Sequence, residues 1–138
     1  MMNISTRGRY ATRIMVLLAS QPELSALSKH EIAQAEMITA AYVQQLMMAL
    51  RLAGLVRSHR GREGGCSLSR APKDITVADV LAAVEGDIMP APCRVTGHCD
   101  RSETCPTRPL WERAAEILGD LFSGTTIAQL AQSRPAAE

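Results

Sequence analysis

Segment 7–20 predicts a first helix, because its apolar residues recur at the three- to four-residue spacing of one helix face. The residues on this face are Tyr10 or Ala11, Ile14, Leu17 and Leu18. Pro22 ends the helix, since proline cannot continue it. Three arginines near its start, Arg7, Arg9 and Arg13, fit either an ordinary solvated face or a helix that crosses a DNA backbone.

Two further helices are predicted close together in the chain. Ser28 and Glu31 form a capping box that opens a short helix, and Thr39 is placed to cap a longer one that Gly54 closes. Four residues of the longer helix are expected to face the core: Val43, Leu46, Met47 and Leu50. Its outward residues are then Thr39, Ala41, Tyr42, Gln44, Gln45 and Arg51. This order is typical of a helix-turn-helix, although other helical hairpins look similar.

Residues 55–59 and 66–69 read as two short strands joined by the turn 60–65. Three glycines in this turn permit a tight hairpin, whose side chains Arg60 and Arg62 can reach phosphates or a minor groove. A turn rich in arginine and glycine is often only solvated. Its place directly after a helix-turn-helix favours a wing that contacts DNA.

The second half of the chain predicts a short helix and then a long one. Thr76 and Asp79 cap the short helix, and Gly86 ends it. A long helix runs from Leu110 to Gly124, before a last turn. Because its wide apolar stripe lies outside a small winged domain, we expect it to pack against a second copy of the chain. The residues assigned to this dimer interface are Leu110, Trp111, Ala114, Ile117, Leu118, Leu121 and Phe122.

These elements predict a mainly α fold. We expect a winged helix-turn-helix DNA-binding domain with a two-stranded wing at residues 1–86. A cysteine loop should follow at 87–109, and a long C-terminal dimerisation helix with a short tail at 110–138.

The composition is typical of a helical core, and the charge differs between the two halves of the chain. Apolar residues make up 46% of the chain and aromatic residues only 3%, so the core is expected to consist of Leu, Ile, Val, Ala and Met. Residues 1–70 carry nine Lys and Arg against four Glu, or +5, whereas residues 71–138 carry six against ten acidic residues, or −4. The basic half is therefore the candidate for a polyanionic partner. No run of eighteen apolar residues occurs, so we expect a cytoplasmic protein without a membrane span.

Three of the four cysteines, Cys93, Cys99 and Cys105, follow the pattern C-x5-C-x5-C in a loop rich in proline, glycine and polar residues. A disulfide framework fits poorly, because the cluster has an odd number of cysteines and the composition is that of a cytosolic protein. Structural zinc usually takes more closely spaced cysteine pairs. An iron-sulfur cluster accepts wider spacing within one flexible loop. We favour the cluster and keep zinc open.

Two other functions are set aside. The tripeptide 98–100 (His-Cys-Asp) contains residue types used in nucleophilic catalysis, but neighbours in sequence rarely form such a site and no sheet is predicted that would build a cleft. An electron carrier would have no use for a basic wing. A zinc-stabilised or metal-independent winged-helix DNA-binding protein remains the alternative to one that carries an iron-sulfur cluster.

Four stretches occur together along the chain: RGRYA at 7–11, AGLV at 53–56 leading into the wing turn, the helix region 75–86, and the cysteine loop running into Leu110 and Trp111. In this combination, over residues 3 to about 132, the chain resembles the winged-helix iron-sulfur regulators of the IscR, NsrR and RirA type, the Rrf-two family. The resemblance implies a homodimeric bacterial transcription regulator, usually a repressor, that binds a palindromic promoter site in double-stranded DNA.

The resemblance also assigns residues. It places the family's cluster ligands on Cys93, Cys99 and Cys105. It places the recognition helix on Tyr42, Gln44 and Gln45, and the wing on Ser58, Arg60 and Arg62. IscR-like members have a histidine three residues after the last cysteine, where this chain has Arg108, so the fourth ligand stays open between His98, Asp100 and Glu103. We favour a two-iron two-sulfur cluster over a four-iron four-sulfur one, and expect it to gate promoter binding in response to iron supply, redox state or nitric oxide.

Overall fold

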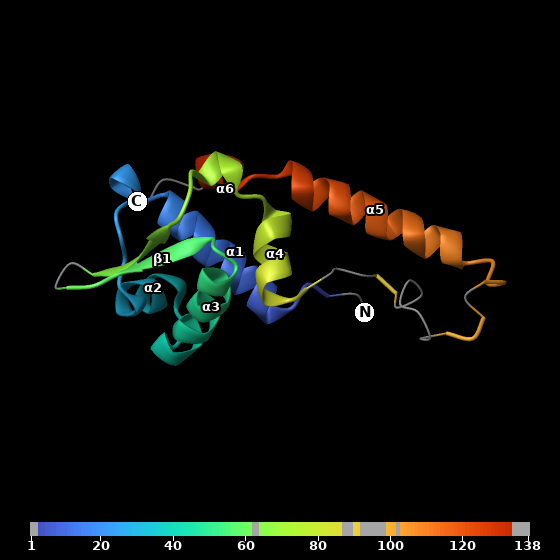
Figure 1. Cartoon of the computed structure of the whole chain (residues 1–138), viewed down its shortest axis with the longest axis horizontal. Coiled ribbons are helices and arrows are strands. Elements are labelled where there is room, and N and C mark those ends of the chain that lie inside the picture. Colours follow the sequence, from blue (N-terminus) through green and yellow to red (C-terminus); the bar gives the residue numbers. More distant parts are fainter. Residues whose placement is uncertain (1–2, 62–63, 87–89, 92–98, 102, 134–138) are drawn as a thin grey trace.

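The computed structural model describes residues 3–61, 64–86, 90–91, 99–101 and 103–133. Within these residues the chain forms six α-helices, two 3-10 helices and one two-stranded antiparallel sheet (Figure 1). The predicted mainly α fold with a two-stranded wing is confirmed. Among the residues predicted to bind DNA or metal, Arg62, Cys93 and His98 lie outside the described residues.

Three helices form the helix-turn-helix region. They are α1 (Thr6–Ala19), α2 (Lys29–Glu36) and α3 (Ala40–Leu52), with the 3-10 helix η1 (Pro22–Leu24) after α1. The Ser28 hydroxyl accepts a hydrogen bond from the backbone N–H of Glu31, and the Glu31 carboxylate accepts one from the backbone N–H of Ser28. Thr39 accepts from the backbone N–H of Tyr42 at 3.1 Å. Both helix starts are therefore fixed by the capping residues that the sequence indicates.

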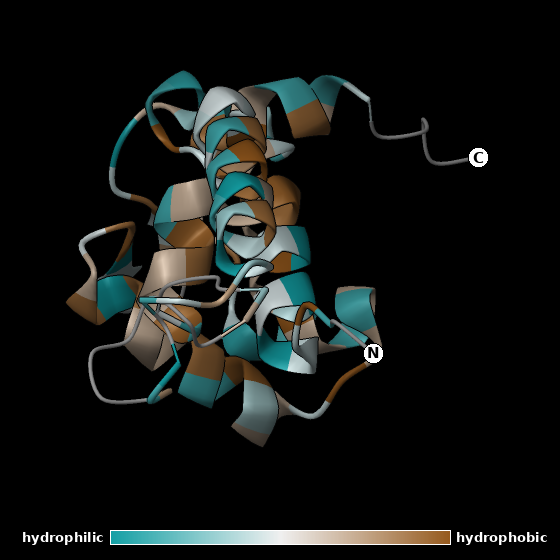
Figure 2. Ribbon diagram, turned by 90° about the vertical axis from the view of Figure 1, so that its right-hand side faces the viewer, coloured by the Kyte–Doolittle hydropathy of each residue, from teal (hydrophilic) through white to brown (hydrophobic). Residues whose placement is uncertain are grey.

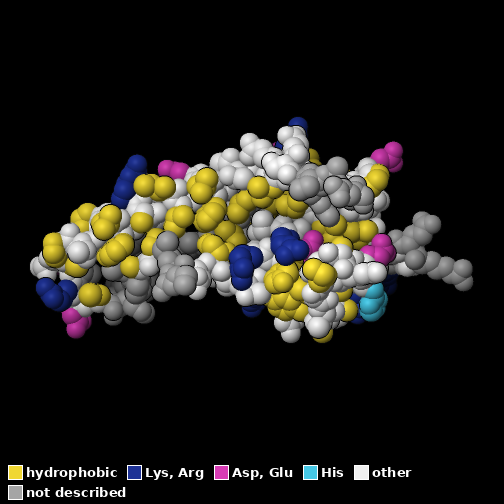
Figure 3. All heavy atoms as spheres, turned by 180° about the vertical axis from the view of Figure 1, so that it is seen from behind, with side chains coloured by type: hydrophobic (Ala, Val, Ile, Leu, Met, Phe, Trp, Pro, Cys, Tyr) yellow, Lys and Arg dark blue, Asp and Glu magenta, His cyan; other side chains and the backbone are white. Residues whose placement is uncertain are grey.

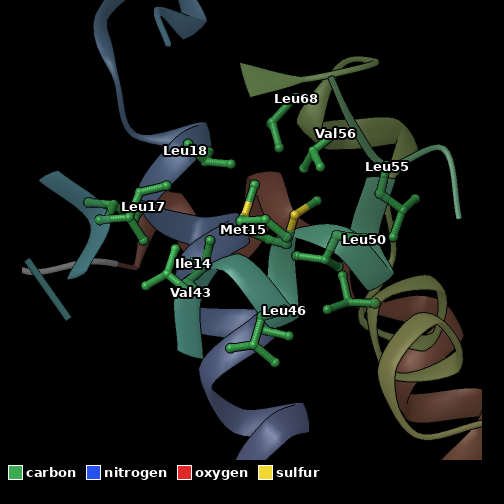
Figure 4. Close-up of a cluster of buried hydrophobic side chains, with 14 of the residues drawn as sticks. Ile14, Met15, Leu17, Leu18, Val43, Leu46, Leu50, Leu55, Val56 and Leu68 are labelled. Atoms are coloured by element: carbon green, nitrogen blue, oxygen red, sulfur yellow. The ribbon is translucent and has the colours of Figure 1, made fainter. Parts of the chain in front are cut away.

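A single cluster of aliphatic and methionine side chains forms the core (Figure 4). Ile14, Met15 and Leu18 of α1 pack against Leu46 and Leu50 of α3, and all five are at most 1% exposed. The predicted inward face of α3 is confirmed, since Val43, Leu46, Met47 and Leu50 are all buried. In α2 the pattern is less regular, because Ala35 is exposed and Glu36 is buried.

The wing consists of β1 (Val56–His59) and β2 (Gly65–Leu68), with Val56 opposite Leu68 and His59 opposite Gly65. A third segment, not predicted from the sequence, joins this sheet. The backbone of Leu27 exchanges two hydrogen bonds with that of Cys66, of 2.7 and 3.0 Å. Because Leu27 immediately precedes the cap of α2, these bonds fix the wing relative to the helix-turn-helix.

Gly65 is required for this close approach. A Cβ atom at this position would lie 2.3 Å from the carbonyl oxygen of Leu27, and its φ of +151° is unfavourable for other residues. The wing glycines therefore do more than shape the hairpin turn. One of them allows the wing to pair with the segment before α2.

After the wing, the 3-10 helix η2 (Pro72–Asp74) leads into α4 (Val77–Val84), which the predicted capping box of Thr76 and Asp79 opens. The residue after this helix ties it to α1. The Glu85 carboxylate accepts hydrogen bonds from the backbone N–H groups of Ser5 and Gly8, at 2.9 and 3.1 Å, and from the Ser5 hydroxyl. A negative charge is thus held at the N-terminus of α1, where the helix dipole favours it.

The last two helices are α5 (Arg108–Gly124) and α6 (Ile127–Gln132). Figure 1 shows α5 extending away from the other helices, while α6 lies back on the winged domain. Thr126 pairs with Thr76, and the Ile127 backbone N–H donates to the carbonyl oxygen of Ile75 at 2.9 Å. Ile127 is fully buried, so the C-terminal end of the chain contributes to the core of the winged domain. None of the described helices is long and apolar enough to cross a membrane.

Candidate functional site

The N-terminal half of α3 presents the residues expected to read DNA. Thr39, Ala41, Gln44 and Gln45 are all exposed, on the side of the helix opposite its buried face. A helix whose first turns expose small and amide side chains can enter the major groove and approach base edges.

Gln44 has a polar partner on the preceding helix. The ammonium nitrogen Nζ of Lys29, the first residue of α2, lies 3.2 Å from the amide oxygen Oε1 of Gln44. Beside this pair is a hollow of about 240 Å³ between α2, α3 and the wing. The residues that line it are Lys29, Gln44, Met47, Met48, Arg51 and Cys66.

Tyr42 is only half-exposed, because an aromatic contact holds it against α1. Its ring packs edge-on to that of Tyr10, with 6.1 Å between the centroids. The Arg13 guanidinium lies 5.3 Å from the Tyr10 ring centroid, and its Nε is 2.6 Å from Oε2 of Glu36, whose side chain is 7% exposed. Arg13 therefore links α1 to α2, although its side chain is 55% exposed. Arg7, near the start of α1, is also exposed.

The wing places two of its predicted DNA contacts at the surface. Arg60 and Ser58 are both exposed, and the Ser58 hydroxyl accepts a hydrogen bond from Nη1 of Arg51 at 2.9 Å. This bond ties β1 to the C-terminal half of α3. The basic hairpin and α3 are consequently held together as one surface.

The cysteine loop is described in part. Cys99 is exposed and Cys105 is half-buried just before α5, and neither forms a disulfide. The Thr107 hydroxyl lies 3.2 Å from the Cys105 sulfur and, together with the Thr107 backbone N–H, holds the pKa of this thiol below its usual range. A lowered thiol pKa favours the thiolate, which is the form that binds metals. No group of three or more Cys, His, Asp or Glu side chains is gathered among the described residues.

Cys99 and Cys105 can supply thiolate donors, and thiolates select zinc, copper(I) or iron-sulfur clusters. Arg108, at the position where IscR-like regulators have histidine, forms an ion pair with Glu112 in the first turn of α5, with Nε 2.8 Å from Oε1. A guanidinium that stays protonated cannot act as a ligand. Asp100 and Glu103 are both exposed in the loop.

Much of the apolar surface of α5 is solvent-exposed. Leu110 is 60% exposed, Ile117 52% and Leu121 58%. Ala114, Leu118 and Phe122 are half-buried, and Trp111 is 39% exposed. Figure 3 shows hydrophobic side chains gathered along the arm that α5 forms, and Figure 2 shows hydrophobic and hydrophilic segments on the same helix. An exposed apolar row of this length indicates an interaction surface.

Several residues that shape the site were not identified from the sequence. They are Leu27, Lys29, Glu36 and Glu85. Leu27, Lys29 and Glu85 act through partners on other elements, so their local sequence carries no signal of their roles. Glu36 does carry one, because it is a charged residue on the same predicted helix face as Ile32 and Ala33.

The comparisons with known proteins agree with this arrangement. Residues 4–133 match the family model Rrf2, described as an iron-dependent transcriptional regulator. The chain is 36% identical to the regulator CymR of Bacillus subtilis over 130 residues, covering 94% of this chain and 90% of CymR. It is 30% identical to IscR of Klebsiella pneumoniae over 133 residues, covering 96% of this chain and 82% of IscR.

Solved structures show the same fold. The structure of B. subtilis CymR, described as a global cysteine regulator, superposes with a TM-score of 0.82 at 35% identity, covering 98% of this chain and 100% of CymR. The structure of T. potens IscR superposes with a TM-score of 0.79 at 28% identity, covering 99% of this chain and 93% of IscR. Because its relatives are transcriptional regulators, the chain is a regulator and not an enzyme. It belongs to the Rrf2 family of winged-helix transcriptional regulators.

Proposed function

We propose that two copies of this chain pair through α5 and bind a palindromic promoter site, with α3 in the major groove and the wing beside it. The observation that carries the proposal is the joint surface of exposed α3 residues and the basic wing, held together by Arg51 and Ser58. In a dimer this surface occurs twice, and a palindromic duplex offers the same bases to both copies.

In the proposed mechanism Cys93, Cys99 and Cys105 would hold an iron-sulfur cluster, and its loss would change promoter affinity. The loop lies between α4, which packs on α1, and α5, which carries the dimer surface. When bound, an iron-sulfur cluster supplies redox-sensitive cross-links among the thiolates that hold it. With the cluster bound, the three cysteines would hold the two ends of the loop together. The Thr107 hydroxyl, 3.2 Å from the Cys105 sulfur, favours the thiolate of this ligand. Losing that constraint changes how the two DNA-binding domains are spaced, and spacing on the duplex is a geometric requirement.

The first prediction concerns salt. If a dimer makes about six phosphate contacts, its affinity for a promoter duplex should fall roughly 10³-fold between about 50 and 200 mM salt, because bound counterions are released from DNA. Replacing Arg60 with alanine should weaken binding to all duplexes about equally. It should also reduce the salt slope, which is the slope of log affinity against log salt concentration, by about two per dimer. Fluorescence anisotropy at several salt concentrations measures both quantities.

The matched control is Lys73→Ala, which removes an exposed positive charge from η2, outside the helix-turn-helix and wing. Its salt slope should equal that of the unmodified protein. An unchanged slope for Arg60→Ala would mean that the wing does not contact DNA. An affinity that does not change with salt concentration would contradict the proposed function.

The second prediction concerns the cluster. Protein reconstituted without oxygen should absorb visible light and contain iron, and a triple Cys→Ala variant at positions 93, 99 and 105 should be colourless. The loaded and empty forms should differ in promoter affinity by about tenfold or more, which is about 1.4 kcal/mol. Cys66→Ala is the matched control and should keep both colour and affinity, because Cys66 lies in β2 outside the loop.

A second candidate function follows from the likeness to CymR, whose structure is described as that of a cysteine regulator. In that case promoter binding would not depend on an iron-sulfur cluster. A colourless protein that binds zinc, or equal affinity of the loaded and empty forms, would favour this alternative. Under this alternative the chain would still bind DNA as a dimer.

A further inference from the structure

Lys29 and Gln44 form a contact that bears on which base the recognition helix reads. A glutamine side chain carries one carbonyl oxygen, which accepts hydrogen bonds, and one amino group, which donates two. The Lys29 ammonium group can only donate. The atom of Gln44 that faces it, 3.2 Å from Nζ, must therefore be the oxygen Oε1, and the amide is oriented by its partner.

The backbone position of Lys29 is fixed by the start of α2, while its side chain lies at the exposed surface beside Gln44. It is the first residue of this helix, directly after the capping box of Ser28 and Glu31. The Leu27 bridge to Cys66 anchors the same segment to the wing. The lysine stem thus stands beside Gln44, over the hollow that Met47, Met48, Arg51 and Cys66 complete.

Adenine and guanine present different donors and acceptors in the major groove, so they make different contacts with the amide oxygen and the amide nitrogen of a glutamine. Adenine presents an acceptor and a donor, so a bidentate contact needs both the amide oxygen and the amide nitrogen. Guanine presents two acceptors, N7 and O6. With Lys29 on the Gln44 oxygen, the Gln44 amino group and the remaining hydrogens of Nζ together form a donating pair. This pair matches the two acceptors N7 and O6 of guanine, whereas at adenine only N7 accepts and the N6 amino group would meet a donor and a neighbouring positive charge.

We infer that Lys29 is a positioning residue for base specificity: by holding Oε1 of Gln44, it makes this glutamine select guanine over adenine. The inference rests on the proposed DNA binding and adds the base that one residue selects. Gln45, the adjacent exposed amide, is not part of this contact.

The test compares four duplexes that differ only at the base pair read by Gln44. That position is found first, as the one at which Gln44→Ala loses discrimination in binding to a randomised half-site library. There the unmodified protein should prefer guanine to adenine by roughly tenfold, which is about 1.4 kcal/mol. Lys29→Met has a side chain of similar length without charge, and it should lower the guanine to adenine ratio to one or below, because the freed Oε1 lets Gln44 pair with both N6 and N7 of adenine. Lys29→Arg keeps a cationic donor and should retain the preference.

Lys73→Met controls for the loss of one positive charge and should leave the ratio unchanged. The inference is overturned if Lys29→Met weakens all four duplexes equally with a shallower salt slope, because Lys29 would then be a phosphate contact only. It is also overturned if Gln44→Ala changes preference at no position. Failure of the unmodified protein to bind any duplex would instead overturn the proposed function, and this inference with it.

Discussion

Replacing Ile117 with glutamate is expected to convert the protein to monomers and to lower its promoter affinity by roughly 100-fold or more. Ile117 is 52% exposed in the single chain, so a glutamate there can remain solvated and the winged domain should fold normally. In the proposed dimer the same carboxylate would be buried without a partner, which is costly. Binding of two linked domains exceeds binding of one by about 10²- to 10⁴-fold, and that gain is lost in a monomer.

Light scattering and anisotropy measure the two effects. Gly119→Glu is the matched control, since it adds the same side chain on the opposite side of α5, at an exposed position where no atom lies within 4 Å of the new Cβ. This control should stay dimeric and bind DNA normally. A dimeric Ile117→Glu protein would exclude the exposed row of α5 as the dimer surface. Leu118 is a less clear probe, because it is already half-buried in the single chain.

Replacing Ile127 with alanine is expected to destabilise the winged domain by about 2–5 kcal/mol, because it removes three buried carbon atoms and leaves a cavity. Ile127 is fully buried, and its backbone N–H is bonded to Ile75 at the start of the α4 region. For a protein of this size, the melting temperature should fall by roughly 6–15 °C. Thermal unfolding followed by circular dichroism measures the change.

Leu52→Ala is the control for this experiment. Leu52 is an aliphatic residue of the same size but is 84% exposed at the end of α3, so its truncation should change stability by no more than about 0.5 kcal/mol. An Ile127→Ala protein as stable as Leu52→Ala would mean that α6 is not part of the cooperative core.

Local signals account for most of the fold that the sequence predicts. The caps at Ser28, Thr39 and Thr76 lie where the sequence indicates, because each capping bond joins residues only three positions apart. The inward face of α3 follows from its spacing in the same way. Strand ends differ by one residue, since β1 begins at Val56 and β2 at Gly65.

Contacts between distant segments were not predicted. The pairing of Leu27 with the wing and the burial of Ile127 join residues far apart in the chain, and neither segment has a composition that distinguishes it from an ordinary turn. At the candidate site, the exposure of Gln44 follows from helix periodicity, whereas its bond to Lys29 depends on how α2 and α3 cross. The cysteine cluster stays a prediction, because Cys93 lies outside the described residues.

The place of Ile127 in the core also has a consequence for the order in which the protein is made. Synthesis proceeds from the N-terminus, and domains generally fold as units once their residues are available. The helix-turn-helix and wing are complete by Leu68. One fully buried side chain of their core, Ile127, is missing until α6 has been synthesised near the end of the 138-residue chain. By that time α5 already exists. A nascent chain should therefore reach a stable DNA-reading form only after its pairing helix is present, and prematurely terminated chains should be removed as unfolded protein before they can occupy half of an operator.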